Sequence, residues 1–178
     1  MNHLIIYSHY DSDSFSHKLK DRLLAQATAN NENTQVIDLY QDGFNPILAG
    51  DTVVTYTIKK YQDQLRWADH YSFVFPLWWG QMPAILKGFF DRVFTPGFAF
   101  TDWSDGAEGL LGDKTTTLYI STGHSNPHYQ ASGIHDALRC ILQKSVFGKC
   151  GIEAKVNFYG NVSQKSEYSD LPSEIQEK

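Results

Sequence analysis

Tyr129 and His135 stand six residues apart in a stretch, STGHSNPHYQASGIH, that is rich in hydroxyl, imidazole and glycine groups. A phenol and an imidazole both donate hydrogen bonds that stabilise an anion, and both can take part in proton exchange. Thr122 and Gly123, earlier in this stretch, let the backbone approach a ligand closely. The stretch predicts a polar ligand site, although a histidine in the core or at a helix start is the commoner interpretation of His135 alone.

Two other segments carry side chains suited to a ligand. In SHYDSDSFS, Ser14 stands where a helix N-cap is expected, and a helix start offers unpaired amides and a positive dipole end to a phosphate. Simple capping by Ser14 is the alternative. In FPLWWGQMP, Trp78 and Trp79 lie in a turn between two prolines, where they either enclose a planar ring or pack against the following helix.

No metal site is expected. His124 and His128 are four residues apart, but Pro127 between them disfavours a shared helical face, and no cysteine or acidic residue lies close in sequence. The G-x-G-x-x-G, P-loop, nucleophile-elbow and H-E-x-x-H patterns are also absent from the sequence.

The elements around these segments alternate between short apolar strands and amphipathic helices. We expect strands at 4–7, 36–39, 71–75, 115–120 and 154–159, with helical apolar periodicity between them. This alternation predicts one α/β domain over residues 1–178, a three-layer sandwich with a five-stranded parallel sheet. Five such strands admit the order 2-1-3-4-5, which we expect here. In such a sheet ligands bind beyond the carboxyl ends of the strands, where all three segments would meet.

Composition narrows the class of protein further. The chain has 178 residues, a formal net charge of −5 and no block of lysine and arginine, so no nucleic-acid partner is expected. No apolar run reaches the ~20 residues of a membrane span, and the N-terminus is typical of a strand rather than a signal peptide. Cys140 and Cys150 are expected to be reduced thiols. A cytoplasmic protein is predicted.

Two quoted stretches carry a family resemblance. FPLWWGQMPAILKGFFDRVFTPGFAF, followed by ISTGHSNPHYQASGIH, resembles the NAD(P)H dehydrogenase (quinone) family. This family includes DT-diaphorase, the bacterial modulator-of-drug-activity reductases and the ancillary oxidoreductases of glutathione-gated potassium efflux systems. The likeness extends from His3 to about Tyr159. It implies a flavodoxin-like fold, a bound flavin, NAD(P)H as electron donor and a homodimer whose sites are completed by the second subunit.

The resemblance also implies roles for individual residues. Tyr129 and His135 match the family pair that stabilises charge at the flavin N1/O2 edge during hydride transfer. The residues implied to bind the flavin come from the three segments: His9, Ser14, Phe15, Ser16, Pro76, Leu77, Trp78, Trp79, Gly80, Ser121, Thr122, Gly123 and His124.

Three features depart from the family pattern. His124 replaces the second glycine of a T-T-G-G turn, and Trp78 stands where many members have glutamine. The chain also ends soon after the fifth strand, with a polar tail from Gln164 to Lys178, where long members have an extension near the adenine of FAD. FMN is therefore expected, with FAD as the alternative.

The predicted function is a flavin-dependent oxidoreductase that passes two electrons from NAD(P)H to a quinone or similar acceptor by ping-pong hydride transfer. One alternative is a flavoprotein that regulates a glutathione-gated potassium efflux transporter, which would make a membrane transporter its partner. The other is a flavodoxin-like electron carrier.

Overall fold

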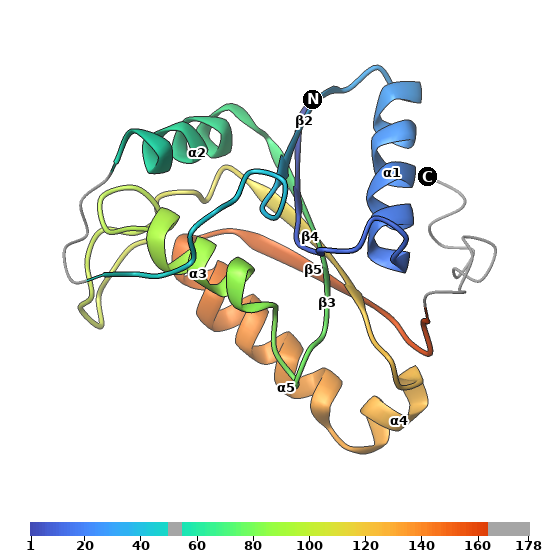
Figure 1. Cartoon of the computed structure of the whole chain (residues 1–178). Coiled ribbons are helices and arrows are strands. Elements are labelled where there is room, and N and C mark those ends of the chain that lie inside the picture. Colours follow the sequence, from blue (N-terminus) through green and yellow to red (C-terminus); the bar gives the residue numbers. More distant parts are fainter. Residues whose placement is uncertain (50–54, 164–178) are drawn as a thin grey trace.

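Five parallel strands form one sheet in a computed structural model that describes residues 1–49 and 55–163 (Figure 1). The strand order is β2-β1-β3-β4-β5, and every neighbouring pair is parallel. The strands are β1 (Asn2–Tyr7), β2 (Asn33–Asp38), β3 (His70–Pro76), β4 (Thr115–Ser121) and β5 (Glu153–Tyr159). The predicted order and strand direction are confirmed.

The second strand lies earlier than expected. It starts at Asn33, opposite Asn2, and ends at Asp38. Its first residues are polar because β2 is an edge strand, so the apolar pattern that begins at Val36 marks only its second half.

Helices cover both faces of the sheet, and one face carries more of them than the other. Figure 1 shows α1 (Phe15–Ala29) on one side and α2 (Tyr56–Trp67), α3 (Ala84–Val93) and α5 (Ile134–Cys140) on the other. The helical segment expected between the fourth and fifth strands continues past α5 as a π-helix, Ile141–Phe147, and a short 3-10 turn, Gly148–Cys150. A short helix, α4 (Asn126–Ala131), occupies part of the segment expected to be a loop. Pro127 is in its first turn, where a proline costs no hydrogen bond.

Most phenylalanines between Trp67 and Trp103 are core residues. Phe89 and Phe90 of α3 pack on a cluster that contains Phe73 of β3 and Phe147. Trp79 and Trp103 behave differently, because their side chains are 103% and 74% exposed. A smaller core of Ile5, Leu19, Val74 and neighbours fills the space under α1.

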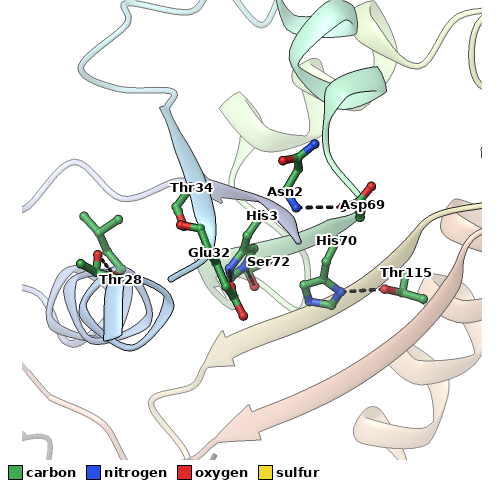
Figure 2. A network of polar contacts seen from close by, with 10 residues as sticks. Asn2, His3, Thr28, Glu32, Thr34, Asp69, His70, Ser72 and Thr115 are labelled. Atoms are coloured by element: carbon green, nitrogen blue, oxygen red, sulfur yellow. Dashed lines mark hydrogen bonds and ion pairs between the residues drawn. The ribbon is translucent and has the colours of Figure 1, made fainter. Parts of the chain in front are cut away.

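A network of polar contacts lies at the amino ends of the strands (Figure 2). The buried His3 ring bonds Glu32 Oε2 through Nδ1 at 3.0 Å and Ser72 Oγ through Nε2 at 2.8 Å. His70 bonds Thr115 Oγ1 at 2.8 Å, and the two imidazole centroids are 5.3 Å apart. Burial lowers the pKa of both histidines, that of His70 to about 4, so both are neutral near pH 7.

Neither cysteine forms a disulfide: Cys140 is exposed and Cys150 is buried. Burial raises the pKa of the Cys150 thiol to about 11. Among the described residues, no helix has the length and apolar character needed to cross a bilayer. The polar tail from Gln164 to Lys178 lies outside the described residues.

Candidate functional site

A cavity of about 610 Å³ lies at the carboxyl edge of the sheet. The loops after β1, β3 and β4 all contribute to its wall, as the sequence predicted from the strand order. The predicted residues that line it are His9, Ser14, Phe15, Ser16, Pro76, Leu77, Trp78, Ser121, Thr122 and Gly123. The predicted residues Trp79, Gly80, His124, Tyr129 and His135 lie outside this wall.

The start of α1 forms one end of the cavity. Ser14 is the N-cap, and its Oγ accepts a hydrogen bond from the His17 amide at 3.1 Å. The capping role considered for Ser14 is therefore present. Ser16 Oγ lies 2.9 Å from Ser121 Oγ, which joins the first turn of α1 to the end of β4. The first amides of a helix have no partner within it, so the α1 start brings donors to this wall.

His9 adds a further donor at the same end. Its Nδ1 accepts a hydrogen bond from the Asp11 amide at 3.0 Å, so the neutral ring carries its proton on Nε2. Burial lowers the pKa of His9, against a smaller opposing effect of Asp11. The neutral ring and its single Nε2–H suit a hydrogen bond to an oxyanion. The ring also contacts Trp78 edge-on, with centroids 5.4 Å apart.

The turn after β3 is a tight two-residue hairpin. Trp78 and Gln81 exchange backbone hydrogen bonds at 2.9 and 3.0 Å, while Trp79 and Gly80 have φ values of +51° and +70°. Two successive positive φ angles are typical of a type I′ turn, which favours Asn-Gly. Trp78 faces the cavity, whereas the side chain of Trp79 is fully exposed. A non-glycine residue at positive φ is strained, and such strain is often found at functional sites.

Tyr129 and His135 are brought together, although neither residue lines the cavity. Their ring centroids are 5.5 Å apart at 23°, and His135 also stacks on Phe158 at 3.9 Å and 10°. His135 is only 1% exposed, and within the described residues neither of its ring nitrogens has a hydrogen-bond partner. Burial lowers its pKa, assisted by the charge of Arg139. A buried neutral imidazole with open nitrogens suits a ligand that brings polar atoms to it.

Four cavity residues were not predicted: Tyr10, Asp11, Val162 and Ser163. Val162 and Ser163 follow β5, so the carboxyl-end rule extended to the fifth strand would have identified them. Tyr10 and Asp11 belong to the loop after β1, but nothing in their types distinguishes them from their neighbours.

The imidazoles of His124 and His128 are close, with centroids 4.6 Å apart. The described residues contain no group of three or more histidine, cysteine or acidic side chains placed to hold a metal ion.

The strand order and the cavity at the carboxyl edge define a protein of the flavodoxin-like fold class. The profile of a family described as flavodoxin-like fold matches residues 1–176. The chain is 34% identical over 171 residues to an uncharacterised NAD(P)H oxidoreductase of Haemophilus influenzae, covering 91% of this chain and 85% of that protein. The chain belongs to this flavodoxin-like family of NAD(P)H oxidoreductases, which confirms the resemblance found in its sequence.

Two further relatives place the chain within the family. NAD(P)H dehydrogenase [quinone] 1 of Cavia porcellus is 31% identical over 177 residues, which cover 84% of this chain and 64% of that enzyme. The chain thus spans less than two thirds of that relative's length. The crystal structure of Smu.1420 from Streptococcus mutans superimposes with a TM-score of 0.78 at 29% identity, covering 96% of this chain and 93% of the other.

Proposed function

We propose that the chain is one flavin-binding domain that oxidises NAD(P)H and passes two electrons to a quinone-type acceptor in a ping-pong reaction. One observation carries the proposal: the loops after β1, β3 and β4, each predicted from the sequence as part of a ligand site, line a single cavity of about 610 Å³. Membership of a family of NAD(P)H oxidoreductases supports the activity.

The residues present fit a flavin. The helix start and the Nε2–H of His9 offer donors for a phosphate at one end of the cavity. Trp78 and Leu77 provide apolar wall for a ring. The unpartnered nitrogens of His135 suit the polar edge of that ring. When bound, the flavin would accept a hydride from the nicotinamide and deliver two electrons to the acceptor.

The protein's own contribution is then binding, orientation and charge stabilisation. Tyr129 Oη and one ring nitrogen of His135 would donate hydrogen bonds to negative charge at the ring edge. Donors held in place before reaction stabilise such charge without reorganising. Because the pKa of His135 is lowered, the neutral imidazole donates from a single nitrogen, and stacking on Phe158 fixes the plane of its ring.

We also propose that two copies associate. An apolar groove of about 430 Å³ runs beside α3 and α5, next to the cavity loops, with Leu77 and Met82 in its wall. Ile141 and Trp103 line the same groove and are 44% and 74% exposed. Exposed apolar side chains along a groove favour association with a second copy. FMN as the flavin and a cytoplasmic location are further proposals that rest on the sequence.

The test is an absorbance spectrum of the purified protein before and after anaerobic addition of NADH or NADPH. Flavin bands that bleach within seconds of nucleotide addition support the proposal, and chromatography of the released cofactor identifies FMN or FAD. Absence of flavin binding after reconstitution contradicts it.

The same spectrum separates the alternatives. Flavin bands that persist with either nucleotide favour a carrier of single electrons or a transporter-regulating flavoprotein. Return of the flavin bands when a quinone is added to the bleached protein favours the enzyme. Because NADH and NADPH are added separately, the relative rates also give the preferred nucleotide.

A further inference from the structure

Two imidazoles extend the Tyr129–His135 pair toward the surface. His124 and His128 are exposed, with ring centroids 4.6 Å apart at 32°. Both rings contact Tyr129 edge-on, at 5.7 and 5.8 Å. Tyr129 stacks in turn on His135. The four side chains form one continuous group that leads from the buried histidine to solvent.

The backbone of His124 directly follows Gly123, a residue of the cavity wall. The carbonyl of His124 accepts hydrogen bonds from Thr122 Oγ1 at 2.9 Å and from the Asn161 amide at 3.0 Å. His128 is carried by α4, which Asn126 attaches to β5 through a 3.1 Å hydrogen bond to the Phe158 carbonyl. Their positions are therefore set by backbone contacts rather than by the imidazoles themselves.

Both rings have donors to offer. Within residues 1–49 and 55–163, neither imidazole makes a hydrogen bond or an ion pair. The acidic and basic side chains of α5, Asp136 and Arg139, form an ion pair with each other at 3.6 Å. An imidazole donates at least one N–H in any protonation state. The pair therefore presents two or more exposed N–H groups, one of them on the residue that follows Gly123 of the cavity wall.

An anionic group on the ligand is the chemistry that such donors recognise. The chain has a net charge of −5, so its overall field disfavours anions wherever no local donor meets them. Hydrogen bonds to an ionised acceptor are about twice as strong as neutral ones. A neutral, apolar quinone would gain little binding affinity from exposed imidazoles. A sulfonate, carboxylate or phenolate on the ring would accept hydrogen bonds from them and bind more tightly.

We infer that His124 and His128 are specificity-determining residues that favour planar electron acceptors carrying an anionic substituent. The inference rests on the proposed oxidoreductase function and adds the acceptor class. The nicotinamide nucleotide is also an anion, so the two imidazoles could bind the nucleotide instead of the acceptor. The test must distinguish these two ligands.

The experiment compares 1,4-naphthoquinone with 1,4-naphthoquinone-2-sulfonate, using the flavin-loaded protein and saturating NADH. His124→Phe/His128→Phe keeps both rings against Tyr129 and removes their N–H groups. We expect kcat/KM for the sulfonate to fall roughly tenfold relative to the neutral quinone, as befits lost hydrogen bonds to an anion. The change should lie in KM for the sulfonate, with KM for NADH unaltered. His124→Asn/His128→Asn, which keeps side-chain donors, should recover most of the preference.

Lys155→Gln is the matched control, because it removes one positive charge from an exposed position on β5. Lys155→Gln should leave unchanged the ratio of kcat/KM for the sulfonate to kcat/KM for the neutral quinone. An unaltered ratio in the double Phe variant, or a change only in KM for NADH, overturns the inference while leaving the oxidoreductase function in place.

A binding measurement keeps the inference testable if the protein reduces neither acceptor. Quenching of tryptophan fluorescence by naphthalene-2-sulfonate is then compared between the wild type and the double Phe variant. Weaker binding by the variant supports the anion site even though the oxidoreductase proposal has failed. Equal binding contradicts it.

Discussion

The hydrogen bond from the Asp11 amide to His9 Nδ1 decides which ring nitrogen of His9 is free to donate. His9→Phe keeps the ring beside Trp78 and removes the Nε2–H. We expect the Kd for FMN to rise about tenfold, the effect of one hydrogen bond to a charged group. Quenching of flavin fluorescence on titration measures it. Tyr56→Phe, at an exposed position on α2 outside the cavity wall, should bind FMN as the wild type does, and an unchanged Kd in His9→Phe would contradict the donor role.

Tyr129 and His135 are predicted to act on rate rather than on flavin retention. Tyr129→Phe combined with His135→Gln should slow flavin reduction by NAD(P)H at least tenfold, because donors to developing charge are lost. Stopped-flow absorbance gives the rate, and the absorbance ratio of flavin to protein gives occupancy. A thermal melt checks that His135→Gln, which alters a buried side chain, is folded. An unchanged rate in a loaded, folded variant would remove the assigned role.

Residue-level prediction from sequence succeeded where local chemistry fixes a role. Ser14 was predictable as an N-cap because its hydroxyl can accept from an amide of the first turn, and the amphipathic run begins directly after it. Val162 escaped notice because its place in the cavity depends on where β5 ends in space. The open nitrogens of His135 were likewise invisible, since burial and the lack of partners are tertiary properties.

At the level of elements, the Trp78–Gln81 hairpin has the most unusual backbone. Trp79 has φ +51° and a fully exposed side chain, so it gains no packing in return for its strain. Asparagine tolerates this conformation better than tryptophan, so Trp79→Asn should stabilise the chain by roughly 0.5–1 kcal/mol. Gly80→Ala, at φ +70°, should destabilise it by about 1 kcal/mol.

Urea unfolding of both variants measures the two effects. A Trp79→Asn protein that is less stable than the wild type would mean that the tryptophan makes a stabilising contact. Activity assays on the same samples would then show whether the exposed ring serves a ligand.

Strands and long helices were predictable because their apolar periodicity is strong and the alternation of β and α allows few topologies. The helix α4 was missed because six residues are too few to show a period, and because a proline that disfavours a helix interior is tolerated in a first turn, where Pro127 lies. The π-helix after Cys140 was not predicted, because π-helices are rare and the apolar period of the preceding α-helix does not distinguish them.

For the whole molecule, the network at the amino edge makes stability depend on pH. The pKa of His70 is about 4 in the folded chain, against about 6.5 for an unfolded histidine. Between these values the unfolded chain binds a proton that the folded chain does not, so stability falls as pH decreases from 6.5 toward 4. We expect a loss of about 1–2 kcal/mol from pH 7 to pH 5, less than the full shift because His70 is partly exposed.

Urea unfolding at both pH values, for the wild type and His70→Gln, measures this dependence. The variant should lose less stability on acidification, and His17→Gln, on α1, should behave as the wild type does. Parallel losses in all three proteins would assign the pH dependence to other groups.

The proposed association of two copies is also a property of the whole molecule. Light scattering at micromolar concentration should give twice the 20.2 kDa of one chain. Ile141→Lys places a charge in the apolar groove and should shift the mass toward that of one chain. A single-chain mass for the wild type would contradict the proposal.

The histidine network and the cavity lie at opposite edges of one sheet, so selection can alter them separately. Substitutions of His3, Glu32 or His70 would tune tolerance to acid without touching a cavity residue. Substitutions in the carboxyl-edge loops would change ligand preference without weakening the opposite edge. Proteins of this fold could therefore adapt to a more acidic environment and to a new substrate through separate sets of substitutions. A laboratory evolution experiment could combine acid tolerance from one set with altered ligand preference from the other.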